Sequence, residues 1–218
     1  MSPDKIIQNV KDKKLIAIVR GVEPEYVIRL AEALLAGGIN MIEVTFNQAG
    51  NDHFASTVAA IEKLSSEMGD RMFVGSGTVM SKEQVDLTVS AGGQYIITPS
   101  TNPEVIRYAK DEGLVAMPGA MTPTEAVTAY EAGADFVKIF PAGNLGPAYI
   151  KAIKAPLAHI PLLAVGGVNA KNIPDFMKAG AVGFGVGGNL VNKEWVRNNE
   201  TEKITALAAE FVAATKQS

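Results

Sequence analysis

The sequence predicts an α/β fold: a closed (β/α)8 TIM barrel, formed as a single domain over residues 1–218 with an extra N-terminal helix. Three observations predict it. Short apolar segments alternate with helical patterns, eight such pairs follow one another, and no linker or low-complexity segment divides them. Alternation favours a parallel sheet, and eight repeats favour closure over an open doubly wound sheet, which is the structural alternative.

The eight predicted strands are short runs rich in apolar and β-branched residues. In chain order they span residues 15–20, 41–46, 72–75, 94–98, 114–118, 135–140, 161–165 and 182–186. Active-site groups of such a barrel are expected at the carboxyl ends of the strands, pointing inward.

Helical patterns fill the intervals between these strands. They span residues 24–36, 53–68, 82–91, 103–111, 123–132, 147–155, 170–178 and 202–215. Glycine recurs where four of these helices must end, and Thr122-Pro123-Thr124-Glu125 fits a capping box. Residues 2–13 are expected to form the extra helix, covering the floor of the barrel.

The composition excludes several classes of function. Hydrophobic residues make up 47% of the chain, the net charge is −3, and cysteine is absent, which excludes disulfides, thiolate metal sites and a cysteine nucleophile. No basic cluster suggests nucleic acid. No signal peptide and no run near the roughly 20 apolar residues of a membrane span is present, so we expect a soluble, cytoplasmic protein without a membrane partner.

Lys138 lies in an apolar segment, Phe136-Val137-Lys138-Ile139-Phe140, that is predicted to be a buried strand. Burial disfavours the charged form of lysine, which leaves a neutral amine able to attack a ketone and form a Schiff base. A lysine that extends its amine to solvent, or pairs with an acid at a strand end, is the alternative.

Glu43 is predicted to face the same interior. Alternation along the second strand directs Met41, Glu43 and Thr45 inward, and the same rule directs Phe136, Lys138 and Phe140 inward on the sixth. A structural ion pair is one interpretation. The other makes Lys138 a nucleophile and Glu43 a general acid and base.

Two glycine-rich turns follow the last two strands. Gly166-Gly167 follows the seventh and Gly187-Gly188 the eighth, where backbone N–H groups of barrels commonly bind phosphate. Tight strand-to-helix connections would also use glycine, so the paired position of the two turns is what favours a phosphate site.

Three further positions are candidates for the rim of the site. Arg20 ends the first strand and could meet an anion, although a solvated arginine is equally compatible. Thr78, in Gly75-Ser76-Gly77-Thr78, could hold a carboxylate, and Pro99 lies in another turn at the mouth. The two histidines, His53 and His159, are too few and too far apart for a zinc-dependent aldol mechanism.

Four motifs in this order resemble the KDPG/KHG aldolase family over essentially the whole chain. They are Ile42-Glu43-Val44-Thr45-Phe46, Val74-Gly75-Ser76-Gly77-Thr78-Val79, the segment 117–125, and Val137-Lys138-Ile139-Phe140-Pro141-Ala142. The resemblance implies a class I aldolase that cleaves 2-keto-3-deoxy-6-phosphogluconate to pyruvate and glyceraldehyde 3-phosphate, or 4-hydroxy-2-oxoglutarate to pyruvate and glyoxylate.

The resemblance also implies roles for single residues. Lys138 matches the Schiff-base lysine, Glu43 the proton-shuttling glutamate and Thr78 the threonine that binds the pyruvate carboxylate. Arg20 matches a strand-one arginine, and Pro99 and Phe140 match residues that shape the pocket. A homotrimer is implied, with a small 2-keto acid as substrate and with no metal or organic cofactor.

The sequence departs from the family pattern at three positions. Asn47 stands where some members have arginine, Val165 where a threonine hydroxyl is expected, and Gly188 where serine is common in the last phosphate turn. Losing a hydroxyl changes discrimination between substrates more than it changes the reaction. A galactonate-derived or unphosphorylated 2-keto acid is therefore also compatible.

Two other functions remain open at this point. A phosphate-binding barrel isomerase or epimerase would use Glu43 as a base and Lys138 as a charged group. A non-catalytic barrel would bind a phosphorylated metabolite and show no Lys138-dependent turnover, although retaining two buried charged groups without function would be costly.

Overall fold

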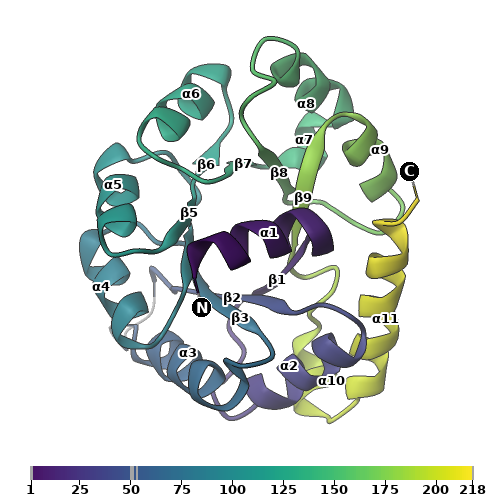
Figure 1. The fold of residues 1–218 in the computed structure, drawn as a ribbon. Helices are drawn as coiled ribbons and strands as arrows, with labels where there is room; N and C mark the ends of the chain where they lie inside the picture. The colour runs from purple at the N-terminus through teal and green to yellow at the C-terminus, as the bar shows by residue number, and fades with distance from the viewer. Residues whose placement is uncertain (1, 50–51, 53, 218) are drawn as a thin grey trace.

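The computed structural model describes residues 2–49, 52 and 54–217. Nine parallel strands form one sheet, in the order β5-β4-β3-β2-β1-β9-β8-β7-β6. Helices surround it as an outer ring, as Figure 1 shows. The strands are β1 (Leu15–Val19), β2 (Met41–Thr45), β3 (Phe73–Gly77), β4 (Tyr95–Ile97), β5 (Val115–Met117), β6 (Gly119–Ala120), β7 (Val137–Ile139), β8 (Leu162–Val165) and β9 (Ala181–Val186).

The predicted barrel is confirmed, with one correction at its fifth strand. The predicted strand 114–118 is two short strands: β5 pairs with β4, β6 pairs with β7, and Pro118 separates them. Proline has no N–H to donate and interrupts a ladder of hydrogen bonds. Strands β5 and β6 stand at the two ends of the sheet order, and only Pro118 separates them in the chain. The chain therefore connects the two ends of the sheet directly, and the sheet closes into a barrel.

The helices alternate with the strands as predicted. They are α1 (Pro3–Lys13), α2 (Val27–Ala36), α3 (Ala55–Met68), α4 (Lys82–Ser90), α5 (Pro103–Asp111), α6 (Pro123–Glu131), α7 (Ala142–Leu145), α8 (Pro147–Lys154), α9 (Ile173–Lys178), α10 (Lys193–Arg197) and α11 (Thr201–Ala214). The one-turn helix α7 and the short α10 were not predicted. Both lie in loops that follow strands on the active-site side of a barrel.

Helix starts differ from the predicted bounds for local reasons. Helix α2 begins after a turn in which Tyr26 N–H donates to the Glu23 carbonyl. Helix α9 begins late because Asn169 and Asn172 bond to one another's backbone and hold a turn before it. The Thr122 capping box is confirmed, with Glu125 as its partner. The predicted start at His53 lies outside the described residues.

Two separate groups of apolar side chains form the core. The larger group lies between the sheet and the outer helices, and contains Ile42, Val44 and Phe46 of the β2 segment. The smaller group fills the barrel itself, and Ile6 and Val10 of α1 join it. Figure 1 shows α1 lying across the end of the barrel, so the predicted floor helix is confirmed.

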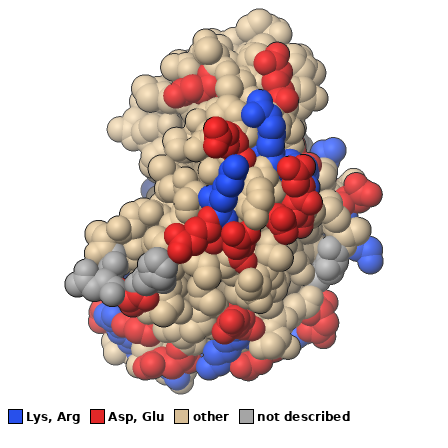
Figure 2. All heavy atoms as spheres, turned by 90° about the vertical axis from the view of Figure 1, so that its left-hand side faces the viewer, with Lys and Arg blue, Asp and Glu red and all other residues tan. Residues whose placement is uncertain are grey.

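The face of the molecule over α4 and α5 is charged but mixed in sign. Figure 2 shows acidic and basic side chains interspersed over α4 and α5, without a broad basic area on that face of the described residues. Contacts link the two helices: Tyr108 Oη donates to Asp86 at 2.7 Å, and Lys82 Nζ lies 4.0 Å from Glu104. Among the described helices, none is long and apolar enough to cross a membrane.

Candidate active site

A cavity of about 350 Å³ opens at the carboxyl ends of the strands. Ten of the eleven residues predicted for the site line it, although they come from distant parts of the chain. These ten are Arg20, Glu43, Thr78, Pro99, Lys138, Phe140, Gly166, Gly167, Gly187 and Gly188. Folding as a barrel brings them together, because Glu43 and Lys138 point inward from the middle of β2 and β7 and the other eight lie just after a strand.

Lys138 occupies the middle of β7 and is 6% exposed. Its neighbours Val137 and Ile139 point to the outer helices, so alternation directs the amine inward. Burial lowers the pKa of Lys138, the negative charge of Glu43 opposes that change, and Arg20 lowers the pKa further. The Nζ atom lies 5.1 Å from the centre of the Phe140 ring, which forms one wall of the cavity.

Glu43 lies on β2 and is 2% exposed. Its side chain extends over Gly77 of β3: a Cβ at Gly77 would lie 1.6 Å from Glu43 Oε1. The Oε2 atom is buried and accepts no hydrogen bond from the described residues. Burial raises the pKa of Glu43 to about 7, against the lowering effects of Lys138 and Arg20.

These two environments are chemically complementary. The pKa shifts bring an amine toward its neutral, nucleophilic form and place a carboxyl where it can both accept and donate a proton near neutral pH. Glu43 lines the cavity, and its buried Oε2 atom keeps hydrogen-bonding capacity that no described residue uses. A purely structural ion pair would instead use its hydrogen-bonding capacity on protein partners.

The glycine turns form the side of the cavity next to β8 and β9. Gly166 and Gly167 both have positive φ, 86° and 74°, and Gly143 of α7 packs against them. A Cβ at Gly143 would lie 2.8 Å from the Gly167 Cα, so the close approach requires glycine. Around the Cβ position of Gly188 no heavy atom of the described residues lies within 4 Å, which leaves this turn open to a ligand.

Cationic groups stand at the rim beside these turns. Arg20 Nη2 donates to Thr78 Oγ1 at 3.3 Å, and Gln48 Nε2 donates to the Thr78 carbonyl at 2.8 Å. Lys193, which was not predicted, lines a smaller hollow of about 190 Å³ together with Arg20, Gly187 and Gly188. Two positive charges therefore flank the last glycine turn.

The family described as KDPG and KHG aldolase matches residues 6–207. The chain belongs to that family. Among curated members, the 2-dehydro-3-deoxy-6-phosphogalactonate aldolase of Escherichia coli strain K12 is 38% identical over 204 residues, which cover 93% of this chain and 95% of that protein.

Solved structures of KDPG and KHG aldolase relatives share the fold. One described as a native KDPGal structure is 38% identical, with a TM-score of 0.83 over 93% of this chain and 94% of that one. The KDPG aldolase of Legionella pneumophila, in which pyruvate was captured as a covalent carbinolamine, is 26% identical, with a TM-score of 0.84 over 96% and 97%.

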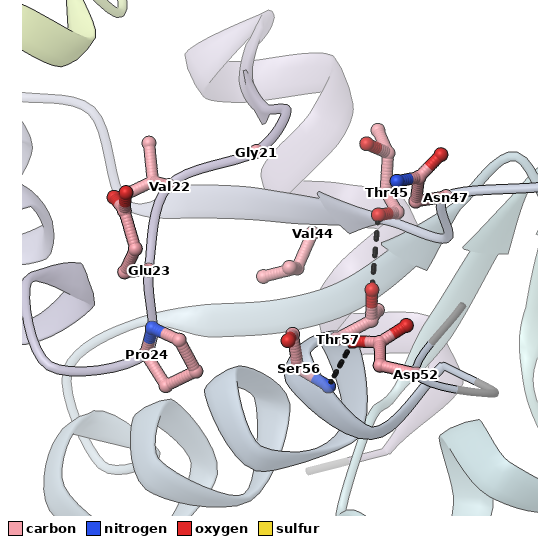
Figure 3. Close-up of a pocket in the computed structure, with 10 residues that line it drawn as sticks. All are labelled: Gly21, Val22, Glu23, Pro24, Val44, Thr45, Asn47, Asp52, Ser56 and Thr57. Atoms are coloured by element: carbon pink, nitrogen blue, oxygen red, sulfur yellow. Dashed lines mark hydrogen bonds between the residues drawn. The ribbon is translucent and has the colours of Figure 1, made fainter. Parts of the chain in front are cut away.

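In this KDPG/KHG aldolase chain, Thr45 is the one predicted site residue that does not line the main cavity. It is 4% exposed, its carbonyl accepts from Thr57 Oγ1 at 3.1 Å, and it lines a second hollow of about 320 Å³ with Asn47. Figure 3 shows this hollow between the loop after β1 and the start of α3. A role for Thr45 in substrate binding stays a prediction.

Sequence reasoning did not find several residues that line the cavity. Val168 and Asn189 belong to the loops after β8 and β9, and Asn189 Nδ2 donates to the Val168 carbonyl at 2.8 Å, tying the two loops together. Their position directly after the two glycine turns was the available signal. Lys193 lies further along the chain and reaches the rim only because α10 folds back to it.

Proposed function

We propose that this chain is a class I aldolase that cleaves a 2-keto-3-deoxy-6-phospho sugar acid into pyruvate and glyceraldehyde 3-phosphate. One observation carries the proposal: the buried amine of Lys138 and the unbonded buried carboxyl of Glu43 line a single cavity at the catalytic end of the barrel. Membership of the KDPG and KHG aldolase family supports it. Cleavage of 4-hydroxy-2-oxoglutarate to pyruvate and glyoxylate is a second activity proposed for the same site.

In the first half of the proposed reaction, neutral Lys138 Nζ adds to the C2 ketone of the substrate and forms a carbinolamine. Protonation of the carbinolamine oxygen by Glu43 releases water and leaves a protonated imine. The positive nitrogen then serves as an electron sink. Burial supports this step because it lowers the pKa of Lys138 and so increases the neutral fraction of the amine.

In the second half, the Glu43 carboxylate removes the proton of the C4 hydroxyl. The C3–C4 bond breaks, the aldehyde forms, and the electron pair moves to the imine nitrogen to give an enamine. Glu43 then returns a proton to C3, and addition of water to the iminium carbon releases pyruvate and free Lys138. A pKa of about 7 suits a group that must both take and give a proton.

The remaining predicted residues are assigned to binding. Thr78, which accepts a hydrogen bond from Arg20, is proposed to hold the substrate carboxylate. The Gly166-Gly167 and Gly187-Gly188 turns are proposed to bind the phosphate, with Arg20 nearby as a positive charge. Pro99 and Phe140 shape the wall of the cavity.

We further propose a galactonate-derived substrate, 2-dehydro-3-deoxy-6-phosphogalactonate, as the preferred one. Val165 lines the cavity and is 4% exposed, so an apolar surface stands where the family pattern places a hydroxyl. A site that lacks a hydrogen-bonding partner does not hold a substrate hydroxyl at that place. The named E. coli relative acts on the galactonate compound according to its description.

Reductive trapping tests the proposed chemistry. Borohydride added with pyruvate should attach one pyruvate-derived group to the protein, and peptide mass analysis should place it on Lys138. Lys151→Met is a matched control, because Lys151 lies in α8, is exposed and does not line the cavity. Absence of an adduct with wild type would contradict the Schiff-base mechanism. Sugar-phosphate isomerisation without trapping would favour the isomerase alternative.

Substrate preference is tested separately. Pyruvate release should be measured from the gluconate-derived and galactonate-derived 6-phospho acids, from their unphosphorylated forms and from 4-hydroxy-2-oxoglutarate. Val165→Thr should move the ratio of kcat/KM toward the gluconate compound by about tenfold, the effect of one hydrogen bond to a substrate hydroxyl. An unchanged ratio would contradict the role given to Val165.

The proposed assembly is a homotrimer, on the strength of the family resemblance. Each chain has a mass of 23.0 kDa, so light scattering on the eluted peak of a sizing column should give about three times that mass. A mass of one chain would contradict the trimer without affecting the chemistry. The proposed partner is a phosphorylated small molecule, and the proposed location is the cytoplasm.

A further inference from the structure

Tyr95 of β4 is a fully buried tyrosine whose side chain crosses a neighbouring strand. It belongs to the apolar group inside the barrel, and its hydroxyl donates to the Ile42 carbonyl of β2 at 2.7 Å. Strand β3 lies between β2 and β4. The tyrosine therefore joins two strands that do not pair with each other.

Gly75 of β3 makes this crossing possible. A Cβ at Gly75 would lie 2.5 Å from the Cδ2 and Cε2 atoms of the Tyr95 ring, so the ring lies directly against the glycine. Gly75 is also the register partner of Glu43 on β2. The ring of Tyr95 thus lies in the barrel layer next to the backbone of Glu43.

The Glu43 side chain fills the space over the next inward-facing glycine of β3. Its carboxyl group lies over Gly77, two residues closer to the mouth than Gly75. Two glycines of β3 therefore accommodate two side chains from the neighbouring strands, the ring on the floor side and the carboxyl on the mouth side. The charge of Glu43 contributes to the raised pKa of Tyr95, after burial, which agrees with this proximity.

We propose that Tyr95 is a positioning residue for Glu43: its ring closes the barrel interior beneath the carboxyl group, and its hydroxyl fixes the carbonyl of the preceding residue, Ile42. The inference rests on the proposed function, in which Glu43 carries protons. Tyr95 does not carry protons itself, because its hydroxyl donates a hydrogen bond to the Ile42 carbonyl and burial raises the pKa of Tyr95 well above the ordinary value.

The test follows proton transfer without a sugar acid. When pyruvate forms the imine with Lys138, Glu43 removes a methyl proton and later returns a deuteron in D2O, so NMR measures the exchange. Exchange and borohydride trapping are recorded for wild type, Tyr95→Leu, Tyr95→Phe and Phe211→Leu. The pH series brackets the Glu43 pKa of about 7. Phe211 is a control because its buried ring lies in the outer core, away from Glu43.

Tyr95→Leu should still trap pyruvate on Lys138. The pH at which its exchange rate is half-maximal should fall by about one unit. Water that reaches the Glu43 carboxyl group weakens the effect of burial, which raises the pKa of Glu43. Tyr95→Phe keeps the ring and should keep the pH midpoint, while its maximal exchange rate falls about fivefold with the lost hydrogen bond. Phe211→Leu should match wild type.

Two results would overturn the inference and leave the proposed function intact. One is a Tyr95→Leu protein that traps pyruvate with the wild-type pH midpoint; the other is a Phe211→Leu protein with an equal shift. If Tyr95→Leu does not fold, an unchanged maximal exchange rate in Tyr95→Phe would overturn it. Failure of wild type to trap pyruvate or exchange its protons would instead contradict the proposed function.

Discussion

The two ends of the barrel interior differ in chemistry although the same strands form both. At the floor, Ile6 and Val10 of α1 pack against Ile16, Phe73 and other apolar side chains, all buried. At the mouth, strands β2 and β7 of the same barrel carry Glu43 and Lys138, and glycines stand where large side chains could otherwise fill the space. Apolar burial stabilises the first region, whereas the second holds two ionisable groups that burial disfavours.

This difference separates stability from chemistry along one axis of the molecule. A change where α1 packs on the floor, below the ring of Tyr95, should weaken folding without altering the reaction, and a change at the mouth should do the opposite. Barrel enzymes in general place catalytic groups at the carboxyl ends of strands and stabilising contacts at the other end. Each of the following changes tests one side of the comparison.

The largest expected effect is on turnover at the mouth. Glu43→Gln keeps the size of the side chain but cannot accept a proton, so kcat for cleavage should fall about 10³-fold, the usual contribution of a general acid and base. Steady-state kinetics measures the loss. Glu23→Gln is the control, because Glu23 pairs with Arg197 outside the cavity and should leave kcat unchanged. A kcat near that of wild type would contradict the role of Glu43.

A floor substitution should change stability alone. Ile6 is 1% exposed, so Ile6→Ala should lower the free energy of unfolding by about 3 kcal/mol through lost burial and the cavity left behind. Urea denaturation measures it, with exposed Lys5→Ala on the same helix as control. At temperatures where the variant is folded, kcat should match wild type. A changed kcat would show that floor and mouth are coupled.

Gly77→Ala should impair catalysis by moving Glu43. The added methyl group would occupy the place of the Glu43 carboxyl, and a displacement near 1 Å can cost about 10²-fold in rate. Kinetics and pyruvate trapping together should show slow cleavage with Lys138 still reactive. Ser76→Ala is the control on the same strand, since Ser76 bonds to Thr88 on the helix side. Equal losses in both variants would contradict a specific effect on Glu43.

The most gradual expected effect is on the pH dependence of stability. Glu43 has a pKa of about 7 in the folded chain against 4.5 for the ordinary group, so the folded state holds the proton more strongly. Wild-type stability should therefore fall as pH rises from about 4.5 to about 7, by on the order of 3 kcal/mol. The free energy of unfolding, measured by urea denaturation at each pH in that window, should depend less on pH for Glu43→Gln than for wild type. An equal pH dependence of the two proteins would contradict the raised pKa.

The sequence predicted the barrel and most of its site because both depend on local patterns. Alternation along β2 and β7 was enough to direct Glu43 and Lys138 to one interior, and the glycine turns identified the loops after the last two strands. These patterns repeat at fixed spacing and depend little on distant contacts. The position of Lys138 in the middle of an apolar strand was an equally local signal.

Other features depend on register and could not be derived from local patterns. The crossing of Tyr95 over Gly75 to Ile42 requires three strands in a particular alignment. The division of the fifth strand at Pro118 depends on pairing with different partners before and after the proline. Lys193 lies at the rim only because α10 folds back toward it. Thr45 does not line the main cavity because its strand ends beside another hollow.

The helix across the barrel floor has a consequence for the order of events during turnover. Because α1 fills that end of the barrel, both halves of a cleaved substrate must leave through the opening at the opposite end. In the proposed mechanism, one half stays attached to the buried Lys138 while the other lies beside the glycine turns. We therefore expect the phosphorylated aldehyde to depart first, and pyruvate to follow only after water has entered by the same route and freed it. In the direction of synthesis, pyruvate is expected to bind before the aldehyde.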